Sequence, residues 1–318
     1  MNEDPYVYNL SSGQPGPRVL IIAGVHGDEW EPMVAAQEII KQLSGRLIAG
    51  HLTVVPVANK DAYGQGSRCG TDNLDLARVC PGQKDGTVTQ RVAYDLSQLI
   101  TASDYIIDMH TGGQVQRIYP MAGYMLHSDK SVYEAQVMMA RMANMPVIWG
   151  TDPLPEGRTL SVARDANKPA IYFEYGGGGA FNREVVDKYV AGIFNLLRKL
   201  GLIKGEVAEQ PIESVFWVED YSSNSGLFQS KMPSPAAGIF IPHFQPGDRV
   251  RKSQVFASLI EPVTGRVTEI SVPFDGFVLA VRVPAGVQQG DALGAVLPIM
   301  QPGKVSIPAG GDLLNPHQ

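Results

Sequence analysis

The chain has 318 residues and a formal net charge of −6, and 44% of its residues are hydrophobic while 18% are charged. This length suffices for one large domain and a smaller one, and the composition is that of an ordinary globular protein. Because Lys and Arg are not clustered, we expect neither a nucleic acid nor a membrane surface as a partner. The N-terminal segment lacks the pattern of a secretory signal, and no apolar run approaches the ~20 residues of a membrane helix. The sequence therefore predicts a soluble, cytoplasmic protein.

Strand and helix patterns alternate along the first two-thirds of the chain. Continuous apolar runs predict buried strands, and apolar residues at helical spacing predict helices. The expected strands cover residues 18–25, 51–59, 104–110 and 169–176, and the expected helices lie within 31–47, 91–100, 131–144 and 183–202. This alternation predicts an α/β domain over residues 1–205, in which helices flank both faces of a mostly parallel, mixed sheet.

After residue 205 the pattern changes to short alternating stretches separated by Pro- and Gly-rich turns, which predicts a smaller all-β domain over residues 206–318. Its two halves, PAAGIFIPHFQPGDRV and VPFDGFVLAVRVPAGV, resemble those of a biotinyl/lipoyl-type barrel. In true carriers a lysine stands at the hairpin between the halves, whereas here Gly265 and Arg266 occupy that turn. We therefore expect a barrel-like cap without an attached cofactor.

Four polar residues follow the predicted strands of the first domain or lie at or near their ends: His26, Glu29, His110 and Glu174. Ligands of α/β sheets bind at the carboxyl ends of the strands. Two imidazoles and one carboxylate hold Zn²⁺ while leaving a position open for water, so His26, Glu29 and His110 are the expected metal ligands. A separate carboxylate, Glu174, is then the expected general base and acid. A lone His-x-x-Glu pair would more often be an exposed loop pair, but the four residues together predict one Zn²⁺ per chain.

Asp108 precedes His110 by two positions, so strand alternation places both side chains on the same face. It would either orient the imidazole of a metal ligand or cap a buried turn. Cys69 and Cys80 are too few for a four-cysteine zinc site. We expect them to be reduced, although a bridge between them stays open.

Together, His26-x-x-Glu29, the segment 68–78, the Asp-Met-His run and the glycine-flanked Glu174 resemble the succinylglutamate desuccinylase/aspartoacylase family of zinc carboxypeptidase-like hydrolases. The resemblance spans residues 18–205, and an appended β-domain is also a feature of this family. It implies hydrolysis of the amide bond of a small N-acyl amino acid. The members most similar in layout include the N-acetyl-diaminobutyrate deacetylase type.

The resemblance also implies roles for arginines. Arg68 would polarise the scissile carbonyl, and Arg78 would bind a substrate carboxylate. The family's Asn–Arg pair is altered here, because Ala77 precedes Arg78, and Asn73 is only a weak substitute. A further substrate-binding arginine is expected upstream of the glutamate, where Arg158 and Arg164 are rival candidates. Surface positions for Arg68 and Arg78 are the alternative.

These observations predict a zinc-dependent deacylase whose partner is a small N-acyl amino acid. Zn²⁺ would acidify a water, Glu174 would move its proton, and Arg68 would stabilise the oxyanion. A metallocarboxypeptidase is one alternative, and a catalytically silent module that binds a small molecule or a protein is another, for which Ala77 is the support. Homo-oligomerisation is left open by the sequence.

Overall fold

The computed structural model describes residues 7–227 and 231–299. Its larger sheet has 11 strands, and its main path runs β1-β3-β2-β4-β7-β5-β13-β10. The strands before residue 220 are β1 (Tyr8–Ser11), β2 (Arg18–Ile22), β3 (His51–Val55), β4 (Tyr105–His110), β5 (Gln116–Met125), β6 (Val147–Thr151), β7 (Ala170–Gly177) and β8 (Phe216–Glu219). The later strands are β9 (Gly238–Pro242), β10 (Arg249–Val250), β11 (Val255–Glu261), β12 (Arg266–Ser271), β13 (Gly276–Arg282), β14 (Gly286–Val287) and β15 (Gly294–Pro298).

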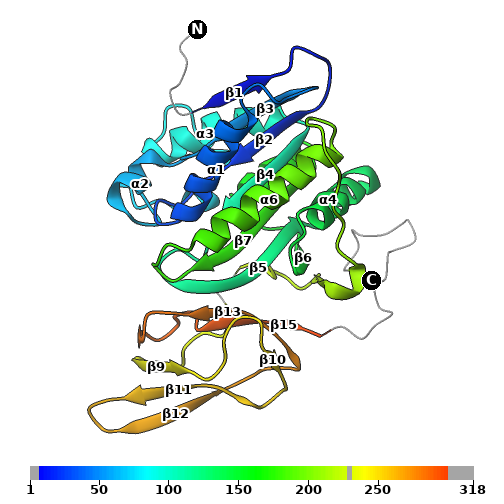
Figure 1. Ribbon diagram of the computed structural model, residues 1–318. Helices are drawn as coiled ribbons and strands as arrows, with labels where there is room; N and C mark the ends of the chain where they lie inside the picture. The colour runs from blue at the N-terminus through cyan, green and yellow to red at the C-terminus, as the bar shows by residue number, and fades with distance from the viewer. Residues whose placement is uncertain (1–6, 228–230, 300–318) are drawn as a thin grey trace, which may run out of the picture.

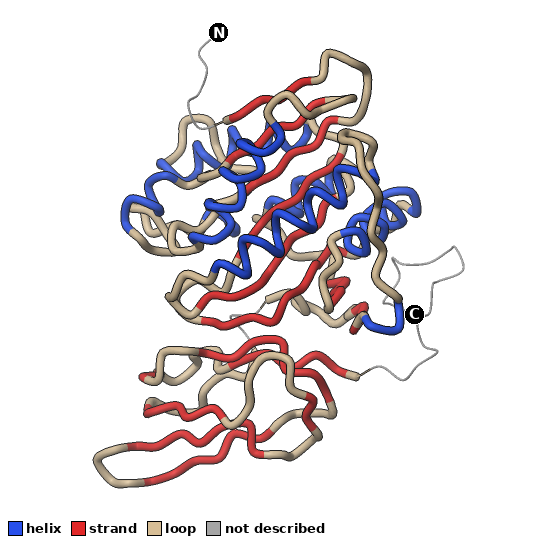
Figure 2. Tube along the Cα trace, viewed as in Figure 1, coloured by secondary structure: helices blue, strands red, loops and turns tan. Residues whose placement is uncertain are grey.

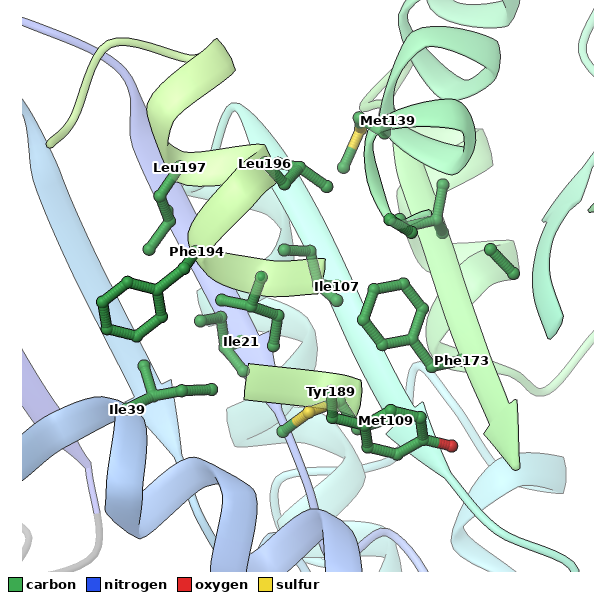
Figure 3. Close-up of a cluster of buried hydrophobic side chains, with 14 of the residues drawn as sticks. Ile21, Ile39, Ile107, Met109, Met139, Phe173, Tyr189, Phe194, Leu196 and Leu197 are labelled. Carbon is green, nitrogen blue, oxygen red and sulfur yellow. The ribbon is translucent and has the colours of Figure 1, made fainter. Parts of the chain in front are cut away.

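Helices cover both faces of the sheet, as the alternating pattern predicts (Figures 1 and 2). The helices are α1 (Trp30–Leu43), α2 (Lys60–Gln65), α3 (Val88–Thr101), α4 (Lys130–Met142), α5 (Thr159–Asp165) and α6 (Arg183–Lys199), with 3-10 turns at Leu76–Arg78 and Ile212–Ser214. Ile21 of β2 packs with α1, α4 and α6 in one core, whereas its neighbour Ile22 packs with α3 and α5 in the other. Figure 3 shows the first core, where Phe173 and Tyr189 lie together. Strands buried on both faces explain the continuous apolar runs.

The sheet is mixed rather than uniformly parallel. Strands β3, β2, β4 and β7 are parallel neighbours, while β5 runs antiparallel to β7. On the far side, β6 is parallel to both β5 and β8. Strand β8 lies after the predicted domain boundary at residue 205, yet it pairs with β6 of the larger sheet.

The barrel-like form expected for the C-terminal domain is not confirmed, because the described residues form no closed barrel. Strands β12, β11, β9 and β14 make a separate four-stranded sheet, while β10, β13 and β15 join the larger sheet. The connection is β13, which pairs antiparallel with β5 through Arg282 opposite Gln116. This pairing covers part of an edge of β5 that would otherwise lack a strand neighbour. The two sheets instead enclose a core that contains Phe240, Phe256 and Val278.

Residues 300–318 of the expected second domain lie outside the described residues. Among the described helices, none is both long and apolar enough to cross a bilayer.

Candidate active site

Three donor groups meet beyond the carboxyl ends of β2 and β4. The Nδ1 atom of His26 lies 2.7 Å from Oε1 of Glu29, and Nδ1 of His110 lies 3.0 Å from Oε2 of the same carboxylate. One ligand atom from each residue lies within 4.8 Å of the others, and all three residues are buried. Two imidazole nitrogens and a carboxylate that converge in this way suit Zn²⁺.

Two aspartates contact the two imidazoles at the ring nitrogens that do not face Glu29. The Nε2 atom of His26 lies 3.1 Å from Asp75, and Nε2 of His110 lies 3.1 Å from Asp108. Each carboxylate fixes the ring orientation and leaves Nδ1 free to face Glu29, which is the usual support of a metal-binding histidine. The donor set and its support therefore fit a zinc ion.

Burial and charge act on the ionisation of this cluster. Burial would raise the pKa of Glu29, but His26 and His110 hold it below its ordinary range. Burial would likewise lower the pKa of His110, whereas Asp108 and Glu29 raise it well above the ordinary value. A negative carboxylate is thus maintained between two imidazoles, as a cation site requires.

The loop between β2 and α1 carries His26 and Glu29 in a conformation that depends on Gly27. A Cβ atom on Gly27 would lie 2.0 Å from the backbone carbon of Ala62, so only glycine fits. Glu29 then stands at the start of α1, and His110 ends β4. Packing against Ala62 therefore explains why a glycine stands between His26 and Glu29 in the motif.

Glu174 of β7 is paired in register with His110 of β4. It lines the same cavity as the three metal-ligand candidates. Its Oε2 atom is buried and has no hydrogen-bond partner within the described chain. Burial raises the pKa of Glu174 from its ordinary value of 4.5 to about 8. A buried carboxyl whose pKa is raised in this way, beside candidate metal ligands, is a candidate for proton transfer.

Arg68 reaches the metal-ligand candidates from the loop after α2. Its Nε and Nη2 atoms lie 3.0 and 2.9 Å from Oδ2 of Asp75, the carboxylate that also supports His26. The Nη1 atom lies 3.4 Å from Nδ1 of His26. This orientation brings a fixed positive charge beside the place where an amide carbonyl would be attacked.

Arg78 and Arg158 both line the cavity, although 80 positions separate them in sequence. A backbone bridge joins Cys80 to Gly157, with the Cys80 N–H donating to the Gly157 carbonyl at 3.0 Å. A Cβ atom on Gly157 would lie 2.3 Å from the Arg78 carbonyl oxygen, so glycine permits the approach. The Nε and Nη2 atoms of Arg158 are buried, and the described residues offer them no partner. The pair suits a carboxylate brought by a ligand.

Arg164, the rival of Arg158, does not line the cavity in the described structure. It lies at the end of α5, where its guanidinium pairs with Glu156 and Asp165 and donates to the Pro153 carbonyl. Ala77 does line the cavity, whereas Asn73 is absent from the described lining residues. The expected amide beside Arg78 is therefore replaced by a methyl group.

Several lining residues had no signal in the sequence, and they come from loops and from the C-terminal strands. Asp28, Thr111, Tyr172, Arg282 and Asp291 are among them. Asp28 stands inside the His26-x-x-Glu29 motif and could have been considered. Arg282 lies on β13, which pairs with β5, and Asp291 lies in the loop before β15, so their approach to the cavity depends on contacts distant in sequence. The cavity has a volume of about 320 Å³, the size of a small-molecule site.

Cys69 and Cys80 are free thiols, so the bridge left open by the sequence is not formed. Asp108 accepts a hydrogen bond from the Thr159 hydroxyl and also contacts His110. Of its two expected roles, the structure places it where a carboxylate orients an imidazole.

The catalytic domain of succinylglutamate desuccinylases and aspartoacylases matches residues 15–200 of this chain. The chain belongs to the succinylglutamate desuccinylase/aspartoacylase family. This confirms the resemblance drawn from the motifs, and with it the prediction of an amide-hydrolysing enzyme.

Family relatives resemble the chain over most of its length. The N-alpha-acetyl-L-2,4-diaminobutyric acid deacetylase of Halomonas elongata is 29% identical over 291 residues, which cover 90% of this chain and 83% of the relative. The product-bound ectoine utilization protein EutE (DoeB) from Ruegeria pomeroyi is 25% identical with a TM-score of 0.83, covering 91% of this chain and 87% of that one. A succinylglutamate desuccinylase/aspartoacylase from Rhodobacter sphaeroides has the same fold, with a TM-score of 0.82 at 24% identity and coverage of 91% and 88%.

Proposed function

We propose that this protein is a zinc-dependent deacylase that hydrolyses the amide bond of a small N-acyl amino acid. The observation that carries the proposal is the convergence of His26, Glu29 and His110 with Glu174 at one cavity. When bound, Zn²⁺ supplies a Lewis acid that polarises an amide carbonyl and makes water a stronger acid.

The side chains of the chain itself account for the remaining chemistry. Glu174, whose pKa is raised by burial, accepts a proton from the attacking water and returns it to the leaving amine. Arg68, held by Asp75, donates hydrogen bonds to the oxyanion that develops on the carbonyl oxygen. The Arg68 guanidinium is already held by Asp75, so less reorganisation is needed when charge develops on the carbonyl oxygen.

The paired arginines support a substrate that carries a carboxylate. Arg78 and Arg158 line one cavity. The Nε and Nη2 atoms of Arg158 have no hydrogen-bond acceptor within the described residues. Burial lowers the pKa of both arginines, and each would gain from an anionic ligand. An N-acyl amino acid with a free carboxylate provides this anion next to its amide.

Neither alternative function is favoured by a specific observation of this kind. A metallocarboxypeptidase needs room for a peptide, whereas Arg282 of β13 and Asp291 of the loop before β15 border this small cavity. A catalytically silent binding module would not need a carboxylate base beside candidate metal ligands. Ala77 replaces an amide that would bind the substrate, but it leaves His26, Glu29, His110 and Glu174 in place. We keep the cytoplasmic location as a prediction.

A substrate panel tests the proposal. Zinc-loaded protein is offered N-acetyl, N-succinyl and N-formyl amino acids, each as the free acid and as the C-terminal carboxamide, and release of the free amine is measured. We expect hydrolysis of at least one free acid and kcat/KM lower by about 10-fold or more for its carboxamide. Equal hydrolysis of acid and carboxamide would refute the carboxylate site, and no hydrolysis of any compound would refute the deacylase.

A further inference from the structure

One neutral donor of the carboxylate site is altered in this chain. Ala77 stands where an asparagine would precede Arg78, so position 77 has no side-chain amide to donate to a substrate carboxylate. Arg78 and Arg158 still line the cavity. A carboxylate offers about four acceptor sites, and buried polar groups are normally hydrogen-bonded. A neutral donor from another part of the cavity would therefore complete the site.

Four side chains among the described lining residues are neutral hydrogen-bond donors outside the metal-ligand candidates: Thr111, Gln116, Thr159 and Tyr172. The Thr159 hydroxyl donates to Asp108, and the Gln116 amide donates to the Ala292 carbonyl oxygen. Thr111 directly follows a candidate metal ligand in the chain, and its hydroxyl oxygen accepts a hydrogen bond from a backbone N–H. Tyr172 is the neutral donor whose surroundings include one of the two arginines.

Tyr172 lies in β7, two positions before Glu174, so strand alternation places both side chains on the same face of the sheet. The residue faces Gly123 of β5, where a Cβ atom would lie 2.5 Å from the phenolic oxygen. Only glycine leaves this room, which gives the ring a defined place in the cavity wall. The residue is 9% exposed, and burial raises the pKa of Tyr172, so its hydroxyl stays protonated and can donate.

The Tyr172 hydroxyl and the Arg158 guanidinium lie in the same corner of the cavity. Burial lowers the pKa of Arg158, and Tyr172 is the strongest influence that opposes this; in return, burial and Glu174 raise the pKa of Tyr172 while Arg158 lowers it. The Thr151 hydroxyl contacts Tyr172 by a hydrogen bond. A Cβ atom on Gly226 would lie 3.2 Å from both Oγ1 of Thr151 and Nη1 of Arg158. Gly226 therefore leaves space beside the two donors.

We propose that the Tyr172 hydroxyl donates to the substrate carboxylate the hydrogen bond that position 77 cannot donate, beside Arg78 and Arg158. This inference rests on the proposed deacylase function. A phenolic hydroxyl donates one hydrogen bond without adding a charge, as the missing amide would. Tyr172 then selects substrates that carry a free carboxylate, because a hydrogen bond to a charged acceptor is stronger than one to a neutral acceptor.

The test measures binding without turnover. Zinc-loaded Glu174→Gln protein is titrated by calorimetry with N-acetyl-L-alanine and with N-acetyl-L-alaninamide, which differ only in the carboxylate. We expect the free acid to bind at least about 10-fold more tightly than the carboxamide. Adding Tyr172→Phe keeps the ring and removes the hydroxyl, and it should weaken binding of the acid by about 10- to 100-fold and binding of the carboxamide by less than about 3-fold.

The matched control is Tyr124→Phe in the same background. Tyr124 is fully buried, its hydroxyl donates to Glu219 at 2.8 Å, and it is not among the described residues that line the cavity. This change should lower the melting temperature while the ratio of the two dissociation constants stays within about 2-fold. If Tyr172→Phe changed that ratio as little as the control does, its hydroxyl would have only a structural role and the proposal would be overturned.

Hydrolysis separates a failure of this proposal from a failure of the deacylase. With Glu174 intact, Tyr172→Phe should raise KM for the free acid by about 10-fold or more, while kcat falls by less than about 5-fold. If the free acid bound as expected but no N-acyl amino acid were hydrolysed, the Tyr172 contact would stand and the deacylase would be refuted. If hydrolysis proceeded and Tyr172→Phe affected acid and carboxamide equally, the contact would be refuted and the deacylase would stand.

Discussion

Arg158 and Arg164 lie at opposite ends of α5, and only Arg158 borders the cavity. Arg158→Ala should therefore lower kcat/KM for a carboxylate substrate by about 10- to 150-fold, because a buried charge-assisted hydrogen bond is lost. The effect should shrink for the matching carboxamide. Steady-state kinetics on both substrates measure this difference.

Arg164→Ala serves as the comparison, since this guanidinium pairs with Glu156 and Asp165 away from the cavity. It should change the stability of the protein rather than the preference for a carboxylate over a carboxamide. If Arg164→Ala abolished that preference while Arg158→Ala did not, the assignment of the two arginines would have to be exchanged.

Glu174→Gln keeps the size of the side chain while removing its proton acceptor. In zinc-loaded protein we expect turnover to fall by roughly 10²- to 10⁴-fold with the metal content unchanged. Parallel rate and elemental measurements separate these two quantities. Unchanged turnover would make Glu174 a structural residue.

The raised pKa of Glu174 also predicts how the metal-free protein responds to pH. Burial shifts this pKa from 4.5 to about 8, so between these values the native state holds a proton that the unfolded state has released. Stability that depends on this proton is fully present at low pH and is lost as the pH rises towards 8. The free energy of unfolding of the wild type, relative to Glu174→Gln, should therefore decline from about pH 5 to pH 8. Urea denaturation of both metal-free proteins would contradict this if the difference stayed constant.

Among the elements, the contact between the loops of Arg78 and Arg158 depends on Gly157. Gly157→Ala would put a Cβ atom 2.3 Å from the Arg78 carbonyl oxygen and would strain a backbone with a φ of +83°. We expect a loss of stability of about 1–2 kcal/mol from the backbone alone, and in addition a higher KM for the carboxylate substrate.

Gly201→Ala is the matched control, because Gly201 has a φ of +77° and nothing within 4 Å of its Cβ position. It should lose similar stability while KM stays unchanged. Denaturation curves and KM values for the two variants distinguish strain from displacement. Equal KM changes would show that the loop contact does not position the arginines.

The sequence predicts the buried parallel strands well, because a strand covered on both faces must be apolar throughout. It does not reveal β5, which contains Pro120 and Gly123 and lacks a continuous apolar pattern. Gly123 leaves room for the Tyr172 ring, whose atoms lie 2.3 Å from its Cβ position. The need for a glycine at position 123 is therefore seen only in the packed structure, and the sequence alone does not show it.

For the site, motif spacing predicts which residues act but not all of their neighbours. His26 and Glu29 follow β2, while His110 ends β4 and Glu174 lies in β7, and each can be recognised from its place beside an apolar run. The choice between Arg158 and Arg164 depends on which end of α5 faces the cavity, and no local pattern decides that. The sequence likewise does not reveal that the buried Oδ1 atom of Asp28 has no hydrogen-bond partner within the described residues.

At the scale of the whole molecule, residues of the C-terminal region line the same cavity as the candidate metal ligands. Strand β13 extends the larger sheet beside β5 (Figure 1). Arg282 of β13 and Asp291 of the loop before β15 line the cavity. The cavity is therefore lined by segments that lie more than 100 residues apart in the sequence.

The central claim is that this assembly hydrolyses amides with one bound zinc ion. The most direct measurement adds Zn²⁺ stepwise to metal-stripped protein and follows hydrolysis of an N-acyl amino acid. The rate should rise from near zero and level off at about one Zn²⁺ per chain. Full activity before zinc is added, or a rate that does not respond to it, would contradict the account.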